Sequence, residues 1–358
     1  MKQNFISFAI AAITLFLSVS GCMKPTPDND NGFHGDPPMG SLSLVIANQG
    51  QFNNGDASLT LYDPASETVE NNIFFKANNA KLGDIAQSLN YHNGKLWIVV
   101  NNSHIIFATD PFTFKEKGRI TGLTSPRNIH FISEEKAYVT QMYSSRIAII
   151  NPKTYEITGY IETSVKDGTE QLVQIGKYIY TNCWTNQKKV LKIDSETDKI
   201  VGHAETGIQP ACIVSDKDGK LWVLTDGGHQ WCTIGEEEPA LSIVNPETLQ
   251  VERKMKFSKG NFVSSLCTNR DKDTIYYLNN GVYKMSIGDN TLPEKAFIPN
   301  DGGNLYALSV NPKPGFNMIA VSDAIDYKQN GKVLIYDFEG KKTDEFSVGI
   351  CPGAFCWY

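Results

Sequence analysis

With 358 residues, the chain is longer than one ordinary domain requires, so we expect either two domains or one large repetitive architecture. Hydrophobic residues make up 41% of it and charged residues 20%, which is typical of a folded globular protein. The formal net charge is -6 and the sequence contains no basic stripe, so nucleic acid is not an expected partner.

Residues 1–21 are predicted to be a lipoprotein signal peptide and not part of the fold. Lys2 supplies a positive charge, and Phe5 to Val19 form an apolar stretch of the length that a secretory signal needs. This stretch is too short for a stable membrane span. It leads into Ser20-Gly21-Cys22, which resembles the end of the bacterial lipobox. The resemblance implies that Cys22 is lipidated and becomes the first mature residue; the alternative is a signal peptide with an incidental cysteine.

Residues 22–40 are predicted to be a flexible tether behind the lipidated cysteine. This segment is rich in Pro, Asp, Asn and Gly, so it cannot bury a core. Asp28 and Asp30 make it acidic. An acidic tether directly after the lipid cysteine resembles the export signal of surface-exposed lipoproteins in Bacteroidetes-type bacteria. That resemblance implies an outer-membrane protein at the cell surface, attached to the membrane by its lipid alone; a periplasm-facing anchor is the alternative.

A unit of strand, turn and strand recurs along residues 41–358. In each unit a run of alternating apolar residues ends in Asp, Asn or, once, Ser, and a turn and a second strand follow. Asp or Asn at this place can hydrogen-bond the backbone two residues on, and a following Pro presets φ for a tight hairpin. The runs end 41 to 51 residues apart and occupy residues 59–63, 106–110, 148–151, 190–194, 241–245, 282–286 and 333–337.

A second strand pair precedes these hairpins. Asn93-Gly94 and Asp218-Gly219, which are strong short-turn signals, lead into the alternating strands Lys95–Val100 and Lys220–Thr225. Four short strands per unit of about 45 residues is the period of a propeller blade. The body is therefore predicted to be all-β, a seven-bladed β-propeller of four-stranded antiparallel blades.

The two ends of the body predict how the ring closes. The segment from Ser41 to Asp63 and the segment after Asp337 are each about half a unit long. Pro352 to Trp357 should therefore supply the inner strand of the blade that begins at Leu42 to Asn48. Such closure pairs both ends of the body in one sheet and leaves no open edge around the ring.

The six cysteines other than Cys22 give no metal-ligand pattern, because none has Cys-x-x-Cys spacing or a His at zinc-ligand spacing. We therefore expect no metal site. Cys212, Cys267 and Cys356 hold equivalent places in the repeat and are expected on inner strands as small apolar fillers. An extracytoplasmic compartment permits a disulfide between Cys183 and Cys232, which the sequence leaves open.

One face of the ring is expected to bind a ligand. Loops that leave the second strand of each unit, and loops that lead into the first, should gather there. They are rich in amides, which both donate and accept hydrogen bonds, and in aromatics, which offer flat apolar contact. This mixture suits a large neutral ligand with amides or hydroxyls, such as a corrinoid or a glycan. The alternative is that Asn, Gly and Ser only form the turns. The candidate residues are Phe52, Asn102, His104, Arg127, Tyr143, Trp184, Asn186, Asp226, His229, Trp231, Tyr306, Asp326 and Tyr327.

Catalysis is not expected, and no cofactor is required. Seven-bladed lactonases and lyases resemble this architecture and need convergent carboxylates with a divalent ion or a His base. Glu170, Asn182 and Asp226 could form such a site, but no spacing demands it. Neither a Gly-x-Ser-x-Gly elbow nor a phosphate-binding Gly loop is present. Trp97 and Trp222 lie within alternating strands and are expected in the core.

The body resembles the YncE-like propellers, whose blades repeat an apolar strand, an Asp-Pro-x-Thr turn and a charged strand. The matching turns are Asp63-Pro64, Asn151–Thr154, Asp194–Thr197 and Asn245–Thr248. With the lipobox, the acidic tether and seven units, the whole chain resembles the BtuG-type surface lipoproteins of gut Bacteroidetes. That resemblance implies capture of cobalamin and its transfer to a TonB-dependent outer-membrane transporter, without requiring cobalt coordination by His104 or His229. The alternatives are another nutrient such as a glycan, a protein-interaction module or a metal-dependent lactonase.

Overall fold

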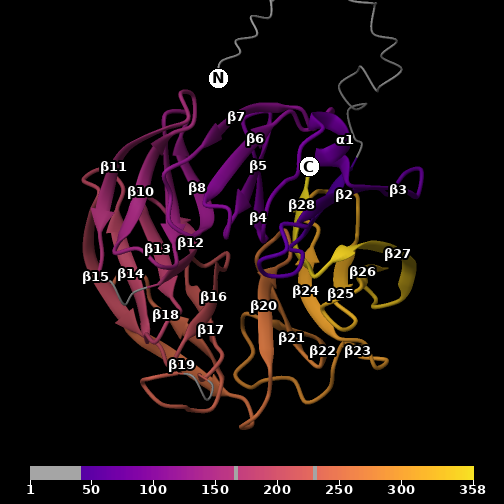
Figure 1. Ribbon diagram of the computed structural model, residues 1–358. Helices are drawn as coiled ribbons and strands as arrows, with labels where there is room; N and C mark the ends of the chain where they lie inside the picture. The colour runs from indigo at the N-terminus through magenta and orange to yellow at the C-terminus, as the bar shows by residue number, and fades with distance from the viewer. Residues whose placement is uncertain (1–41, 165–167, 229–231) are drawn as a thin grey trace, which may run out of the picture. The chain divides into compact units, whose positions relative to one another are not determined.

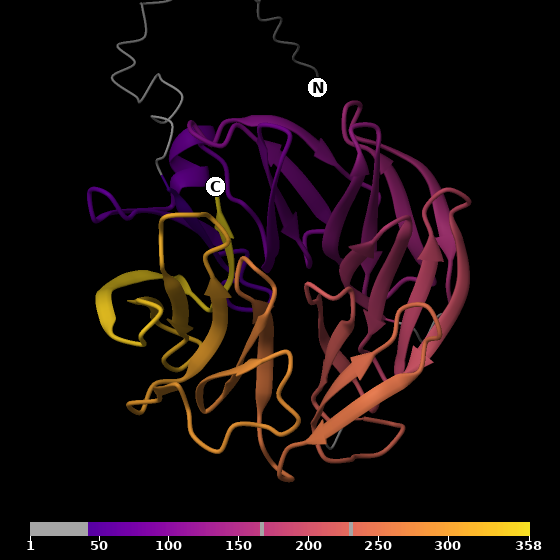
Figure 2. The same ribbon diagram turned by 180° about the vertical axis from the view of Figure 1, so that it is seen from behind.

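The computed structural model describes residues 42–164, 168–228 and 232–358. These residues form seven four-stranded antiparallel sheets arranged as a β-propeller (Figure 1), which confirms the predicted fold. The first strand of each sheet contacts the first strands of its neighbours, so these seven strands surround the central axis. Figure 2 shows the same ring of blades from behind. The predicted signal peptide, Cys22 and the predicted tether lie outside the described residues.

Blades 1 to 4 follow the chain from the axis outwards, and each strand pairs with the next in the sequence. Blade 1 contains β4 (Ala86–His92), β5 (Lys95–Val100), β6 (Ile105–Thr109) and β7 (Glu116–Ile120). Blade 2 contains β8 (Pro126–Ser133), β9 (Lys136–Gln141), β10 (Arg146–Asn151) and β11 (Glu156–Glu162). Blade 3 contains β12 (Thr169–Ile175), β13 (Tyr178–Cys183), β14 (Lys189–Asp194) and β15 (Lys199–Glu205). Blade 4 contains β16 (Pro210–Ser215), β17 (Leu221–Thr225), β18 (Ala240–Val244) and β19 (Val251–Lys256).

Blades 5 and 6 keep this order, whereas blade 7 takes strands from both ends of the body. Blade 5 contains β20 (Val263–Thr268), β21 (Thr274–Asn279), β22 (Gly281–Ser286) and β23 (Ile298–Pro299). Blade 6 contains β24 (Leu305–Val310), β25 (Ile319–Asp323), β26 (Asn330–Tyr336) and β27 (Lys342–Ile350). Blade 7 contains β28 (Pro352–Trp357), β1 (Leu44–Asn48), β2 (Ser58–Asp63) and β3 (Thr68–Asn71).

The predicted ring closure is confirmed. β28 pairs antiparallel with β1, with Leu44 opposite Trp357, and the yellow C-terminal strand lies beside indigo strands in Figures 1 and 2. Trp357 Nε1 donates to Ser309 Oγ in blade 6 at 3.0 Å, and Tyr358 Oη donates to the Pro111 carbonyl in blade 1 at 2.5 Å. The last two residues therefore join blade 7 to both neighbouring blades.

The repeated turns between third and fourth strands form as predicted. The side-chain oxygen of the first turn residue accepts a hydrogen bond from the backbone N–H two residues on, at 2.8 Å for Asp63 and 2.9 Å for Asn151. The same bond is made by Asp110, Asp194, Asn245 and Asp337. In blade 5 the hydroxyl of Ser286 takes this role and accepts from the Gly288 N–H at 3.3 Å.

The core lies between neighbouring blades. Trp97 and Trp222 are buried, as predicted, and Trp222 Nε1 donates to Asp216 Oδ2 at 2.7 Å, so its polar atom is satisfied. The predicted positions of Cys212, Cys267 and Cys356 are also confirmed, since each lies on the innermost strand of its blade. A short helix, α1 (Ile73–Asn78), lies between β3 and β4. Within the described ranges, no helix is long and apolar enough to cross a membrane.

Candidate functional site

Two kinds of loop meet on one face of the ring, which we call the loop face. They are the loops that follow second strands and the loops that lead into first strands. Since strands in a blade alternate in direction, both kinds fall at the same end of the sheet. Backbone hydrogen bonds join them, from Asn101 N to Ile85 O at 2.8 Å in blade 1 and from Ala324 N to Asn304 O at 2.9 Å in blade 6.

In five blades the residue before the inner strand adopts a left-handed conformation. These residues are Ile85, Ser125, Gly168, Gln209 and Cys351, with φ between 46° and 62°. A β-branched residue such as Ile85 rarely adopts this conformation, so the surrounding structure must hold it there. Phe262 and Asn304 occupy the equivalent positions in blades 5 and 6 and do not adopt it. The loop face is therefore built differently at these two blades.

The second residue of each inner strand lies near the end of that strand at the loop face, and together these residues form a ring around the central axis. The side chains at these positions are polar or charged in blades 1 to 3 and small in blades 4, 5 and 7. In blade order the residues are Gln87, Arg127, Glu170, Ala211, Ser264, Tyr306 and Gly353. A Cβ atom at Gly353 would lie 2.4 Å from Gln49 Nε2, so glycine leaves room for the Gln49 amide. Gln49 Oε1 accepts a hydrogen bond from Tyr306 Oη at 2.6 Å.

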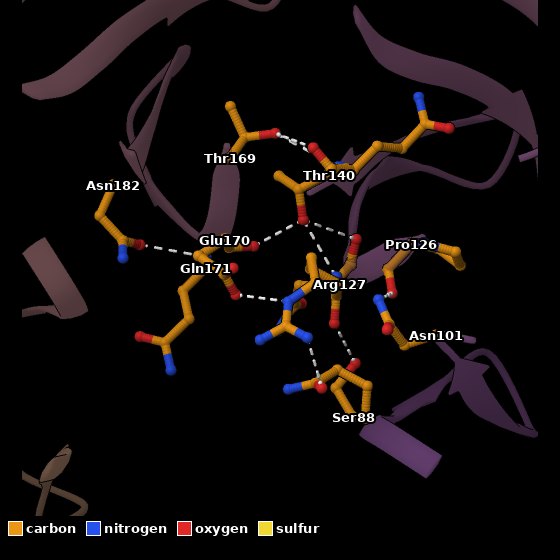
Figure 3. Close-up of polar contacts among 12 residues, drawn as sticks. Ser88, Asn101, Pro126, Arg127, Thr140, Thr169, Glu170, Gln171 and Asn182 are labelled. Carbon is orange, nitrogen blue, oxygen red and sulfur yellow. Dashed lines mark hydrogen bonds and ion pairs between the residues drawn. The ribbon is translucent and has the colours of Figure 1, made fainter. Parts of the chain in front are cut away.

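Arg127 and Glu170 form a partly buried ion pair between blades 2 and 3 (Figure 3). Arg127 Nε donates to Glu170 Oε2 at 2.7 Å, and Arg127 Nη1 donates to Gln87 Oε1 at 2.7 Å. Burial raises the pKa of Glu170 and outweighs the opposing effect of Arg127. This network links the inner strands of the first three blades near the loop face.

Buried polar side chains tie the inner strands of blades 2 and 4 to the preceding blades. Asn101 Nδ2 donates to the Pro126 carbonyl at 3.0 Å, and Asn182 Nδ2 donates to the Pro210 carbonyl at 2.7 Å. Ser88 Oγ donates in the same way to the Arg127 carbonyl at 2.9 Å (Figure 3). These amides are buried and committed to the backbone, so they serve the fold and not a ligand.

A cavity of about 1200 Å³ opens on the loop face over blades 4 to 6. Five asparagines and three aromatic residues contribute to its lining, together with three carboxylates and one lysine. These residues are Asn261, Asn279, Asn280, Asn300, Asn304, Phe262, Tyr306, Tyr327, Asp226, Glu236, Glu237 and Lys259. The lining thus has the amide and aromatic character that the sequence predicts for the ligand face, concentrated on one side of the ring.

The cavity asparagines hydrogen-bond to one another across loops. Asn261 Nδ2 donates to Asn279 Oδ1 at 2.8 Å, and Asn300 Nδ2 donates to Asn280 Oδ1 at 2.8 Å. The Asn300 amide is fully used within the protein, because its nitrogen also donates to the Gly303 carbonyl and its oxygen accepts from the Gly302 and Gly303 N–H groups. The bond between Asn261 and Asn279 uses one donor and one acceptor, so it orients both amides and leaves each with further capacity for a ligand.

The aromatic residues of the cavity differ in how they are held. Tyr306 and Tyr327 pack edge to face with ring centroids 5.7 Å apart, and Tyr327 Oη donates to Asn304 Oδ1 at 3.2 Å. Phe262 is 92% exposed and is the most exposed large apolar side chain in the described ranges. Its ring thus presents bare apolar surface beside a cluster of amides.

Three of the residues predicted from sequence, Asp226, Tyr306 and Tyr327, line the cavity. Arg127 lies on an inner strand and pairs with Glu170 outside the cavity lining. Trp184 reaches Asp226 from blade 3, since its Nε1 donates to Asp226 Oδ2 at 2.7 Å. The structure therefore brings Trp184 to the border of the cavity.

The other described candidates lie outside the cavity lining. Asn186 Oδ1 accepts from the Thr233 N–H at 2.8 Å, and His104 Nδ1 accepts from the Ser125 N–H at 2.9 Å. Phe52, Asn102, Tyr143 and Asp326 also lie on loops of the loop face away from this lining. His229 and Trp231 lie outside the described residues. A ligand role for all of these residues stays a prediction.

Asn261, Phe262, Asn300 and Asn304 were not predicted as site residues. The loop that contains Phe262 did carry a signal, because a bulky aromatic residue is not needed to turn the chain. Within the described ranges, no three His, Cys, Asp or Glu side chains cluster as metal ligands. Cys183 is buried and Cys232 is half-buried, and their pairing stays a prediction.

Comparison with known proteins shows the family. Residues 43–350 match the sequence profile described as Domain of unknown function (DUF5074). The chain belongs to this family. No curated protein matches it.

Several solved structures have the same fold. A Quinonprotein alcohol dehydrogenase-like protein from Bacteroides thetaiotaomicron has a TM-score of 0.65 at 16% identity, over 87% of this chain and 77% of that one. The periplasmic gluconolactonase of Pseudomonas aeruginosa has a TM-score of 0.64 at 12% identity, over 88% and 99%. Apo AztD from Citrobacter koseri has a TM-score of 0.57 at 12% identity, over 89% and 98%. At such low identities these likenesses show the fold alone.

Proposed function

We propose that this DUF5074 propeller is a surface lipoprotein that binds cobalamin or a related corrinoid in the cavity of its loop face. The observation that carries the proposal is the cavity of about 1200 Å³, lined by five asparagines and three aromatic residues. A site of this volume exceeds the usual range for drug-sized ligands, so it suits a larger molecule.

The chemistry of a corrinoid complements that lining. The edge of the corrin ring carries many amides, and its faces are apolar. Oriented asparagine pairs such as Asn261 with Asn279 can both donate to and accept from ligand amides. Phe262 and Tyr327 can cover an apolar ring face. Because these groups stand on a closed ring of sheets, binding orders few side chains and loses little affinity to entropy.

The N-terminal sequence supports a transport role for such a binding protein. The lipobox ending at Cys22 and the acidic tether favour a lipid anchor on the outer membrane, exposed at the cell surface. A captured nutrient must then cross that membrane, and in this proposal a TonB-dependent transporter receives it. The protein itself acts by binding and requires no cofactor or catalytic residue.

A glycan is the second candidate, and Phe262 is the observation that favours it. An aromatic ring that is 92% exposed among asparagines offers a stacking surface for a sugar ring, with amides placed to bind hydroxyls. The corrinoid remains the first choice because the cavity combines several aromatic and amide groups over one large volume.

Calorimetric titration of cyanocobalamin into residues 41–358, with the visible corrin spectrum recorded in parallel, tests the proposal. We expect one-to-one binding that weakens about tenfold in Phe262→Ala, which corresponds to about 1.4 kcal/mol. Phe75→Ala is the matched control, because Phe75 is exposed on α1 and does not line the cavity. Absence of both heat and spectral change at high concentration would refute the corrinoid proposal, and titration with soluble polysaccharides would then test the glycan.

A further inference from the structure

The outer part of blade 5 is incomplete. Its fourth strand, β23, has only two residues and pairs with β22 at Gly281 and Val282 alone. The fourth strands of the other blades contain four to nine residues. The turn before this strand is also irregular, because the run at 282–286 ends in Ser and lacks the Asp-Pro turn. Part of the surface that blade 6 turns towards blade 5 is therefore not covered by a full strand.

A groove of about 170 Å³ occupies this place between blades 5 and 6. Val282, Ile298, Val321 and Leu334 give it apolar walls, and β23 lies at its outer end. Its polar side is formed by strands of blade 6 and the loop before it, with Asp301, Asp323, Lys332, Tyr336, Lys342 and Glu345. The groove thus combines apolar walls with groups that can hydrogen-bond at an edge.

The groove adjoins the large cavity. Asn300, Gly303 and Leu305 line both of them, so a ligand that extends from the cavity into the groove would pass these three residues. Ion pairs fix the polar side, since Lys332 Nζ and Lys342 Nζ lie 3.0 and 2.7 Å from the Glu345 carboxylate. This side therefore offers oriented hydrogen-bonding groups of both charges.

We propose that this groove is a second subsite, which binds a pendant heteroaromatic ring of the ligand held in the cavity. The volume of the groove limits the size of the ring that it can bind, because a cavity of about 150 Å³ accommodates a benzene-sized molecule. The apolar walls favour aromatic faces, and Lys332, Asp323 and Tyr336 can bind ring heteroatoms or an attached polar linker. The proposal rests on the proposed function, in which the ligand is a corrinoid, and it adds which part of that ligand determines specificity.

Comparison of cyanocobalamin with dicyanocobinamide, which lacks the pendant base, tests the subsite. We expect the wild-type protein to bind cyanocobalamin at least about tenfold more tightly. Leu334→Trp fills the groove and should bring the two affinities within about twofold of each other, without weakening cobinamide. Val201→Trp is the matched control, because it places the same ring on the exposed face of β15 and should leave the ratio unchanged. A wild-type ratio near one, or a ratio unchanged in a folded Leu334→Trp, refutes the subsite while cobalamin binding itself stands.

Leu334→Ala provides a second test of the subsite if Leu334→Trp does not fold. It removes a wall of the groove, so we expect weaker cyanocobalamin binding and unchanged cobinamide binding; equal effects on both refute the subsite. If neither corrinoid binds the wild-type protein, the proposed function fails and benzimidazole becomes the probe. Saturation-transfer NMR should then show benzimidazole binding that Leu334→Trp abolishes, with glucose as the sugar-ring control. Absence of benzimidazole binding, or binding of glucose alone, overturns the heteroaromatic subsite.

Discussion

Asn182 joins blade 3 to blade 4 through its amide nitrogen and holds the inner strand of blade 3 through its amide oxygen. Its side chain is fully buried, Nδ2 donates to the Pro210 carbonyl at 2.7 Å, and Oδ1 accepts from the Gln171 N–H at 3.0 Å. Asn182→Ala removes both bonds and leaves a buried carbonyl and an N–H without their partner. At about 1–2 kcal/mol for each group, we expect the free energy of unfolding to fall by about 2–4 kcal/mol.

Two further variants separate the bonds from the loss of volume. Asn182→Asp keeps the acceptor but places a carboxylate oxygen against the Pro210 carbonyl, so it should destabilise more than alanine does. Asn101→Ala loses the single bond to the Pro126 carbonyl and should lower the free energy of unfolding by only about 1–2 kcal/mol.

Equilibrium urea unfolding of residues 41–358, followed by tryptophan fluorescence, measures these differences. The expected order of stability is wild type, Asn101→Ala, Asn182→Ala and Asn182→Asp. A loss below about 0.5 kcal/mol for Asn182→Ala, or a more stable aspartate than alanine variant, would show that these amides do not hold the blades together.

Other predictions concern ring closure and pH. Tyr358→Phe removes the hydrogen bond to the Pro111 carbonyl and should lower the free energy of unfolding by about 1 kcal/mol in the same assay; an unchanged midpoint contradicts this. Burial lowers the pKa of His130 below its usual 6.5, so unfolding free energy should decrease as pH falls below about 6.5, and His130→Gln should reduce this dependence. Burial raises the pKa of Glu170, so the folded state holds the proton of this carboxyl more tightly than the unfolded state does. The stability that this proton binding contributes is lost as pH rises above about 4.5. Between pH 4 and 8, the urea midpoint of Glu170→Gln should therefore increase relative to that of the wild type as pH rises. A difference between the two midpoints that does not change with pH would contradict the buried state of this carboxyl.

Most of the fold could be predicted because it depends on short-range signals. Each Asp or Asn at a turn, such as Asp63 and Asn151, forms its hydrogen bond within three residues, so the sequence alone reveals it. The closing strand Pro352–Trp357 was predictable from length, since the two half-units add up to one blade. The fourth strand of blade 5 was not foreseen to be so short, because no local signal fixes where an outer strand ends.

The candidate site was only partly predictable because it depends on how blades pack. Trp184 and Asp226 are far apart in the sequence, and only the adjacency of blades 3 and 4 brings them into hydrogen-bond contact. The loops around Phe262 and Asn304 line the cavity, and at these two positions the backbone differs from that of the other five blades. Sequence periodicity identifies equivalent positions, but it does not show which of them depart from the common conformation.

The pairing of β28 with β1 sets the order in which the molecule can be completed. β1 is made first and β28 last, so the edge of β1 stays open until the final residues of the chain are available. A contact between such distant segments is slow to form, because a long stretch of chain must first be organised. During synthesis, the seventh blade therefore closes only after residues 352–357 have been made. A chain that stops before β28 leaves the edge of β1 unpaired, and such an edge can pair with another chain and aggregate.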